Sequence, residues 1–258
     1  MAREWDAGEY EELSAPQTRW GAEVLERLDA RGDEAAIDAG CGTGRVTELL
    51  LAKLPHGSVL AVDGSEAMVD AARRRFADEP RVRVERRDLL ELQVAEPVDL
   101  IFSTATFHWI KDHDKLFENL ARALKPGGRL VAQCGGEGNI SRATRATRET
   151  MDEERFGEYF VGWDDDKNYA DVETTARRLE AAGFDEVETW LHDETAAFES
   201  VDELARFLGT VVLGGHLERL PEEERGPFAA AVAEKIEAVD GSPALDYVRL
   251  NMTARRSA

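Results

Sequence analysis

Apolar and polar positions follow two alternating patterns between residues 30 and 135. Runs of four to six mostly apolar residues predict buried strands. Between these runs, apolar side chains recur every three or four positions, which predicts amphipathic helices. Strands that alternate with helices over short connections form a parallel sheet covered on both faces, so we expect a doubly wound α/β core. The predicted strands are 35–39, 58–63, 82–85, 98–103 and 129–134.

Three helical faces lie between the predicted strands. The third of them is followed by KPGG at 125–128, which predicts the end of that helix because proline and glycine rarely continue one. The faces consist of Val46, Leu49, Leu50 and Leu54; of Ala67, Met68, Ala71, Ala72 and Phe76; and of Leu116, Phe117, Leu120 and Leu124.

The chain outside this core has a less regular pattern. An amphipathic helix is expected over 17–28, before the first strand. The acidic run DDDKN at 164–168 lacks the glycine and the distal glutamate of a calcium loop, and predicts a solvated charged segment. The other predicted elements are helices at 141–154 and 171–182, two helices within 201–239, and strands at 185–191 and 247–255.

The charge of the chain restricts its partners. Its 258 residues carry a formal net charge of −21, and arginine supplies 26 of the 32 basic residues. Such a field repels phosphate, so no nucleic-acid or membrane partner is expected. The two cysteines, Cys41 and Cys134, form no metal or disulfide pattern. The charged N-terminal segment and the lack of a long apolar run predict a cytoplasmic protein. No bound metal is expected, because His108, Asp112, His113 and Asp114 fit no familiar ligand spacing.

A glycine-rich turn, AIDAGCGTG at 36–44, follows the first strand. Glycine allows a ligand to approach the backbone closely, and this turn is the usual nucleotide position in an open α/β sheet. The spacing Gly40, Gly42, Gly44 differs from the G-x-G-x-x-G of dinucleotide-binding proteins. Asp38, two residues before the first glycine, favours a ligand that carries positive charge rather than two phosphates.

Acidic residues also occur at the end of the second predicted strand and just after the third. Asp63, 23 residues after Gly40, occupies the position whose carboxylate accepts hydrogen bonds from ribose hydroxyls. Asp88 is placed to accept from an exocyclic adenine amine, with Leu89 beside the ring, although a helix N-cap would show the same pattern. Together these residues indicate an adenosine with a cationic tail.

The motifs AIDAGCGTG, AVDGSEAM, RDLLEL, VDLIFSTATFHWI and LKPGGRLV, in this order, resemble those of class I S-adenosylmethionine-dependent methyltransferases. FHWI and the N-terminal Tyr and Trp residues look most similar to the trans-aconitate methyltransferase group and its small-molecule relatives. The resemblance implies S-adenosyl-L-methionine as the cofactor and a mostly parallel, seven-stranded Rossmann-like sheet, with inserted helices that form a substrate lid. It also implies cofactor-binding roles for Gly40, Gly42, Asp63, Gly64, Ser65, Met68, Asp88, Leu89, Ser103 and Gln17, with Asp38 beside them.

The pattern along the chain predicts one domain with inserted helices, which we expect to be a methyltransferase domain over residues 1–258. Within it, 1–30 would form a helical lid, 31–135 the cofactor-binding core, and 136–258 the substrate-facing helices and a closing β-hairpin. We expect a monomer or a homodimer.

Residues expected near the transferred methyl group indicate two kinds of methyl acceptor. His108 is a candidate catalytic base for a hydroxyl or an amine, since the pKa of histidine lies near neutrality. Arg142, with Arg145 and Arg148 at three-residue spacing, would instead bind a carboxylate, or would form a solvated face paired with Asp152, Glu153 and Glu154. Aromatic side chains would either cover the reacting methyl group or simply pack in the protein interior. The aromatic residues expected to contact the substrate are Tyr10, Trp20, Trp109 and Trp163.

The best interpretation is methyl transfer to a small-molecule carboxylate of the trans-aconitate kind. O-, N- or C-methylation of a hydroxyl, amine or carbon nucleophile in a natural product is the alternative. An NAD-dependent oxidoreductase is disfavoured by the glycine spacing and by the lack of a Tyr-x-x-x-Lys pair. A non-catalytic cofactor-binding protein and a nucleic-acid methyltransferase are weaker alternatives, the latter opposed by the charge.

Overall fold

The computed structural model describes residue 8 and residues 15–165 and 167–258. The chain divides into two compact units. The first unit comprises Met1–Glu137, Asn168–His192 and Arg249–Ala258, and the second comprises Gly138–Lys167 and Asp193–Val248. The predicted single domain with an inserted lid stays a prediction.

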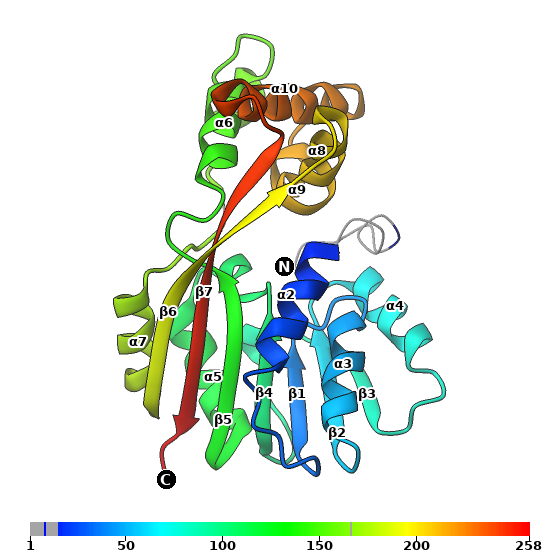
Figure 1. Cartoon of the computed structure of the whole chain (residues 1–258), viewed down its shortest axis with the longest axis vertical. Coiled ribbons are helices and arrows are strands. Elements are labelled where there is room, and N and C mark those ends of the chain that lie inside the picture. The colour runs from blue at the N-terminus through cyan, green and yellow to red at the C-terminus, as the bar shows by residue number, and fades with distance from the viewer. Residues whose placement is uncertain (1–7, 9–14, 166) are drawn as a thin grey trace. The chain divides into compact units, whose positions relative to one another are not determined.

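A seven-stranded sheet has the order β3-β2-β1-β4-β5-β7-β6 (Figure 1). The first five strands pair in parallel, and β7 pairs antiparallel with β5. The strand order reverses between β1 and β4, where open α/β sheets bind their ligands. The strands are β1 (Ala35–Ala39), β2 (Ser58–Asp63), β3 (Val82–Arg86), β4 (Val98–Thr104), β5 (Leu124–Gly135), β6 (Phe184–Ala197) and β7 (Ala244–Arg256).

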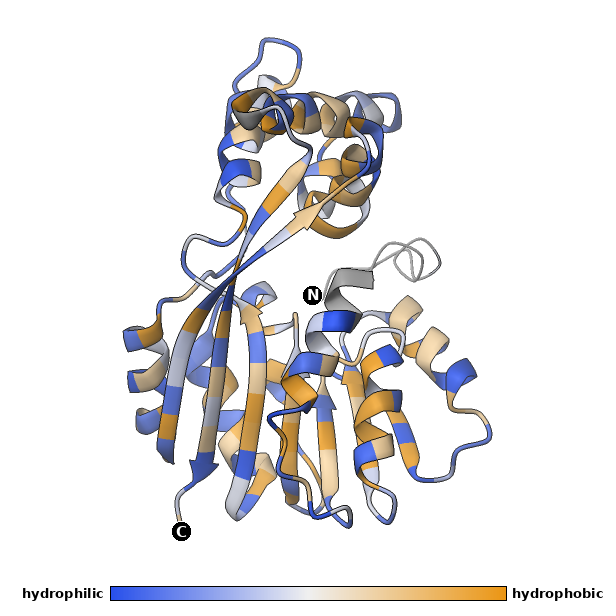
Figure 2. Ribbon diagram, in the orientation of Figure 1, coloured by the Kyte–Doolittle hydropathy of each residue, from blue (hydrophilic) through white to orange (hydrophobic). Residues whose placement is uncertain are grey.

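Helices cover both faces of this sheet in the first unit because neighbouring strand residues point to opposite sides. Ile37 of β1 packs with residues of α5 (His113–Ala123) and α7 (Val172–Ala181). Its neighbour Ala36 packs instead with residues of α2 (Ala15–Leu25) and α3 (Arg45–Lys53). Ala72 of α4 (Glu66–Arg75) contacts Cys41 and Ala61. The apolar strand centres stand out in Figure 2.

The second unit is helical, apart from the outer parts of β6 and β7. Its helix α10 packs against α6 and α8, and the rings of Phe156, Phe160 and Phe228 meet in its core. The helical elements are α6 (Ser141–Met151), the 3-10 turn η3 (Gly157–Phe160), α8 (Val201–Phe207), the π-helical turn η4 (Leu208–Val212), α9 (Gly214–Leu217) and α10 (Glu222–Asp240).

The predicted doubly wound sheet is confirmed, and three local expectations are corrected. Leu124 begins β5 instead of ending the preceding helix, and KPGG forms an irregularity inside this strand, where Gly127 has a φ of 74°. Leu49 is 38% exposed because Thr47, Leu50 and Leu51 occupy the buried face of α3. The segment 201–239 contains a π-helical turn and a short helix between its two longer helices. No helix in the described part of the chain is long and apolar enough to cross a membrane.

Candidate functional site

The glycine turn lies at the carboxyl end of β1 and has positive φ angles at Gly40 and Gly42, of 90° and 53°. A Cβ atom on Gly40 would lie 2.0 Å from Oγ1 of Thr106, so this glycine lets β1 and the loop after β4 approach each other. A Cβ atom on Gly42 would meet nothing within 4 Å. Gly42 therefore borders open space, as a backbone cradle for a ligand requires.

Asp38 lies at the same end of β1 and is 1% exposed. Its Oδ2 accepts a hydrogen bond from the Thr47 hydroxyl at 2.6 Å. Burial, opposed by the Thr47 bond and assisted by the nearby carboxylate of Asp63, raises the pKa of Asp38 to about 7. A buried carboxyl with such a pKa is well suited to a cationic ligand, whose charge would favour the ionised form.

Asp63, at the end of β2, connects the glycine turn to the start of α4. Its Oδ2 accepts from the backbone N–H of Gly42 at 3.0 Å, and its Oδ1 from that of Ser65 at 2.9 Å. A carboxylate offers about four lone-pair positions, and these two bonds use two of them. Ser65 in turn caps α4, where its Oγ accepts from the N–H of the buried Met68. The Gly64 carbonyl accepts from Nε of Arg86 at 3.1 Å.

Asp88 caps the 3-10 turn η1 (Leu89–Glu91), and its Oδ1 accepts from the Leu90 N–H at 2.9 Å. Asp88 therefore has the N-cap geometry that its sequence pattern also allowed. The Leu89 side chain is 5% exposed and belongs to the apolar core, while its carbonyl accepts from Nδ2 of Asn119. An adenine contact by Asp88 and Leu89 stays a proposal.

Ser103 is fully buried at the end of β4, and its hydroxyl donates to the Ala39 carbonyl at 2.6 Å. This bond joins the ends of β1 and β4. Ala105 follows with a φ of 56°, a strained conformation for a residue with a side chain, and the Thr106 hydroxyl donates to Thr104 and Gly40 carbonyls. Sequence reasoning missed Ala105 and Thr106, because a positive φ at alanine leaves no signal in the sequence.

His108 lies in the 3-10 turn η2 (Phe107–Trp109) and is 7% exposed. Its ring stacks on Tyr169, with 5.8 Å between the centroids, and lies 5.0 Å from that of the half-buried Trp109. The Gly135 N–H donates to its Nδ1 at 3.3 Å. Because Nδ1 is the acceptor, the neutral ring carries its proton on Nε2 and presents a donor there.

The predicted substrate residues fall in different places. Trp20 is 1% exposed in the first unit, with the Arg249 guanidinium carbon 4.8 Å from its ring centroid, so it packs rather than lining an open space. The Arg142 backbone N–H donates to the Asp246 carboxylate in the second unit. Trp163 lines a pocket there. Tyr10 lies outside the described residues, as does the side chain of Gln17, whose backbone is part of α2.

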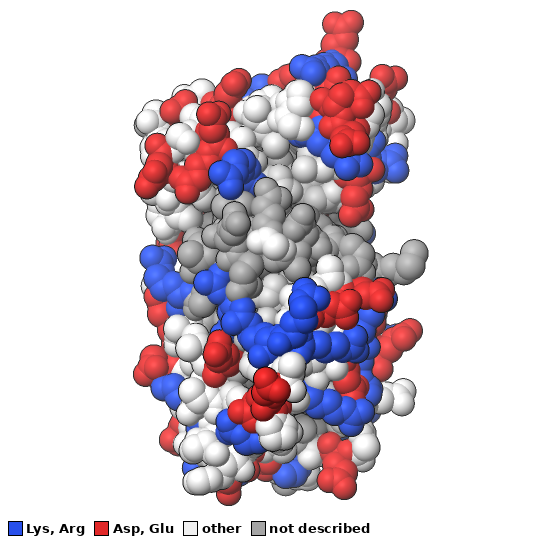
Figure 3. Space-filling model, turned by 90° about the vertical axis from the view of Figure 1, so that its right-hand side faces the viewer, with Lys and Arg blue, Asp and Glu red and all other residues white. Residues whose placement is uncertain are grey.

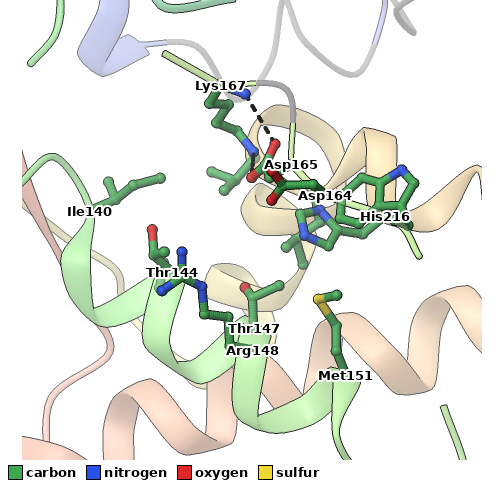
Figure 4. A pocket seen from close by; sticks show the side chains of 13 residues that line it. Ile140, Thr144, Thr147, Arg148, Met151, Asp164, Asp165, Lys167 and His216 are labelled. Carbon is green, nitrogen blue, oxygen red and sulfur yellow. Dashed lines mark hydrogen bonds and ion pairs between the residues drawn. The ribbon is translucent and has the colours of Figure 1, made fainter. Parts of the chain in front are cut away.

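The pocket of the second unit has a volume of about 70 Å³, and Arg148 of α6 contributes to its walls (Figure 4). At another wall, Nζ of Lys167, whose side chain is 7% exposed, lies 2.7 Å from Oδ2 of Asp165. The segment 164–168 is therefore not the solvated charge run predicted from its composition.

The predicted pairing of the arginine stripe on α6 is corrected at two residues. Arg145 pairs with Glu149 at 4.0 Å, and Glu153, a predicted partner of the stripe, pairs with Lys235 at 2.9 Å.

Comparison with known proteins agrees with this architecture. Residues 36–128 match the methyltransferase domain family. The chain is 32% identical to a trans-aconitate 2-methyltransferase of Methylobacterium nodulans, over 98% of this chain and 99% of that protein. It is 29% identical to the enzyme of the same name from Rhizobium meliloti, with the same coverage.

Solved structures share the fold at low sequence identity. A Haemonchus contortus phosphoethanolamine N-methyltransferase 2 in complex with S-adenosyl-L-methionine superposes with a TM-score of 0.62 at 20% identity, covering 98% of this chain and 57% of that one. The YcgJ protein of Bacillus subtilis superposes with a TM-score of 0.64 at 14% identity, covering 93% and 99%.

A doubly wound sheet with an open glycine turn, and with carboxylates at the ends of its first two strands, defines a nucleoside-binding α/β protein. The family and the full-length relatives then specify the chemistry. The chain belongs to the class I S-adenosylmethionine-dependent methyltransferases, together with the trans-aconitate 2-methyltransferases. It is a methyltransferase that uses S-adenosyl-L-methionine, as the motifs indicated.

Proposed function

We propose that this enzyme transfers a methyl group from S-adenosyl-L-methionine to a carboxylate of a small polycarboxylic acid of the trans-aconitate type, forming a methyl ester. The observation that carries the proposal is the similarity to trans-aconitate 2-methyltransferases over 98% of the chain. This similarity includes the second unit, which lies outside the matched domain family. The predicted cytoplasmic location, the monomeric or dimeric state and the lack of a nucleic-acid partner belong to this proposal. The net charge of −21 supports only the last of these, because it repels phosphate.

The residues around the glycine turn fit the cofactor. Gly42 borders open space that the amino-acid portion would occupy, and the Asp38 carboxylate would face its positive charge. Asp63, which already orients the Gly42 and Ser65 N–H groups, would accept from the ribose hydroxyls. Ser103 would act through its bond to Ala39, since it holds the ends of β1 and β4 together.

Bound S-adenosyl-L-methionine supplies a methyl group on a positively charged sulfur. One carboxylate oxygen of the acceptor would form the new C–O bond as the C–S bond breaks, with the electron pair left on sulfur. A carboxylate is ionised at neutral pH, so no proton needs to leave and no general base is required. The enzyme would align the two reactants and exclude water.

For such an acceptor, His108 is better suited as a hydrogen-bond donor than as a base. Its Nδ1 lone pair accepts from the Gly135 N–H, and its Nε2–H can donate to a carboxylate. We therefore propose that His108 orients the acceptor, in place of the catalytic-base role suggested by its sequence position.

The test of the function is a methyl-transfer assay with S-adenosyl-L-methionine and a panel containing trans-aconitate, other di- and tricarboxylic acids, and matched alcohols and amines. The expected product is a carboxylic acid one methyl group heavier that base hydrolysis returns to the starting acid. A product that survives base would indicate methylation at a hydroxyl oxygen, at nitrogen or at carbon, and would contradict the proposal.

The role of His108 is tested with His108→Gln and His108→Phe. Glutamine retains an N–H donor and phenylalanine does not, so kcat/KM should fall by about 10- to 100-fold only in the phenylalanine variant. Loss of activity in both variants, together with a wild-type rate that rises with pH, would instead support a catalytic base.

A further inference from the structure

Thr47, in the first turn of α3, directs its hydroxyl toward β1 instead of toward its own helix. A buried threonine in a helix commonly donates to the carbonyl four residues earlier. Thr150 and Thr175 do so, at 2.8 Å and 2.7 Å. The Thr47 hydroxyl donates instead to Oδ2 of Asp38 at 2.6 Å, and the two residues are 0% and 1% exposed. This hydroxyl therefore contributes to the carboxyl end of β1 rather than to the helix.

The local structure after the glycine turn explains this direction. The Thr43 carbonyl, four residues before Thr47, accepts from Nε of Arg75 at 2.9 Å. Thr47 shares the buried face of α3 with Leu50 and Leu51, so its side chain lies against the sheet. The hydroxyl thus has a carboxylate of the sheet within reach, while the carbonyl that it would otherwise use already has a donor.

Asp38 is surrounded by groups that do not favour its ionised form. Its register partners are the apolar Ala61 of β2 and Phe102 of β4, and in the described part of the chain no basic side chain pairs with it. Burial and the carboxylate of Asp63 both raise the pKa of Asp38. The Cys41 thiol beside it stays neutral, because burial and the two carboxylates raise its pKa well above the usual range. Only the threonine hydroxyl, among the described side chains, donates to this carboxylate.

We propose that Thr47 is a positioning residue whose hydroxyl orients the Asp38 carboxylate and favours its ionised form, so that Asp38 can face the positive charge of the cofactor. The inference rests on the part of the proposed function that places this charge beside Asp38, and does not depend on the methyl acceptor. A hydrogen bond donated to the charged form of a buried carboxyl favours ionisation. Thr47 therefore acts through Asp38 and does not need to touch the cofactor.

The experiment measures the Kd for S-adenosyl-L-methionine by titration calorimetry between about pH 6 and 8.5 in wild type, Thr47→Val and Thr47→Ser. Valine keeps the shape of threonine without the hydroxyl, so the pH below which binding weakens should rise by about one unit. Since the ionised fraction of Asp38 is the one that binds, Thr47→Val should weaken binding by about fivefold near pH 7 and by less than about twofold near pH 8.5. Thr47→Ser keeps the donor and should resemble wild type.

Three further variants separate this role from a merely structural one. Thr47→Ala also lacks the hydroxyl and should show the same rise in pH. Thr175→Val removes a buried hydroxyl bond of similar length from α7, and should leave the Kd and its pH dependence unchanged. Thr47→Val combined with Asp38→Asn should bind like Asp38→Asn alone, because no carboxylate is left to ionise. Circular-dichroism melting curves verify that each variant is folded.

The pH profile decides between the possible outcomes. An unchanged Kd near pH 7 in Thr47→Val and Thr47→Ala would overturn the role of Thr47. Binding that weakens by the same factor at every pH, or a Thr47→Ser variant as weak as Thr47→Val, would also overturn it, since the effect would then be one of packing. These measurements need no acceptor. An enzyme that methylates no carboxylate would therefore remove the proposed function and leave the role of Thr47 standing.

Discussion

At the scale of single residues, Asp38 couples cofactor binding to pH. Its pKa of about 7 lies above that of an aspartate in an unfolded chain, near 3.9. The folded protein therefore binds more protons than the unfolded chain between these values, so the stability associated with this group is present at low pH and is lost as the pH rises through 7. A cationic ligand beside Asp38 offsets that loss, because it favours the ionised carboxylate.

The expected result is that affinity for S-adenosyl-L-methionine falls as the pH drops below 7, and that binding near pH 7 releases protons from Asp38. Titration calorimetry in two buffers of different ionisation enthalpy measures this release. Asp38→Asn, the control, should bind more weakly and lose the pH dependence attributable to this group. An identical pH profile in wild type and variant would show that Asp38 does not face the cationic part of the cofactor.

The two glycines of the turn should differ in what their replacement costs. Gly40→Ala would place a methyl group 2.0 Å from Thr106 Oγ1 at a φ of 90°, and should lower the free energy of unfolding by about 3 kcal/mol. Gly42→Ala enters open space at a φ of 53° and should cost only about 1 kcal/mol, while it weakens cofactor binding. Urea denaturation and cofactor titration of both variants test this. Equal stability losses would contradict the packing role of Gly40.

At the scale of elements, the turn that leads into β1 is held by a buried carboxylate. Glu34 is 0% exposed and accepts from the N–H groups of Arg31 and Gly32, each at 2.8 Å, and from Nη2 of Arg129 in β5 at 2.7 Å. Burial would raise the pKa of Glu34, but the backbone hydrogen bonds and the charge of Arg31 lower it overall. Its carboxylate therefore joins the turn before β1 to a side chain of β5.

Glu34→Gln should lower the free energy of unfolding by about 2 kcal/mol near neutral pH, because the charge-assisted bonds are lost. A lowered folded pKa means that this stabilisation is present above the unfolded pKa near 4.3 and is lost as the pH falls through the folded value. The difference in the free energy of unfolding between wild type and Glu34→Gln should thus be constant between about pH 6 and 8 and should shrink below about pH 4. Asp33→Asn, in the same turn with a 68% exposed side chain, is the control and should change stability little.

At the scale of the whole molecule, the charge of −21 is unevenly distributed. Figure 3 shows basic side chains gathered on the face that carries α4 and β3, with acidic side chains among them. These arginines are paired locally, as Arg86 is with Glu66 at 2.9 Å and Arg75 with Glu48 at 3.3 Å. Exposed pairs contribute little stability, so the unpaired excess of carboxylates dominates the electrostatic free energy.

Raising the salt concentration from about 10 to about 150 mM should therefore raise the melting temperature, because screening weakens the repulsion between carboxylates more than it weakens the pairs. Differential scanning calorimetry in sodium chloride and in tetramethylammonium chloride measures the effect. The two salts should act alike. A melting temperature that falls with salt would mean that the ion pairs outweigh the net charge.

The strands and helices of the core were predictable because hydrophobic periodicity is a local property of the chain. Five strands lie within a few residues of their expected positions, apart from the start of β5. The exposure of Leu49 and the strand character of Leu124 were not predictable, because each depends on which neighbour covers the position. The same holds for Lys167, whose burial beside Asp165 depends on the fold of the second unit.

The sequence by itself determined the class of the enzyme and its cofactor. Glycine spacing and acidic strand ends are local features, and a ligand that contacts backbone requires them wherever the fold places them. Only the tertiary structure decided that Asp38 has a pKa of about 7, that His108 presents its Nε2–H, and that Arg148 rather than Arg142 lines a pocket. Burial and hydrogen bonding from segments distant in the sequence determine protonation, tautomer and orientation, and these neighbours exist only in the folded chain.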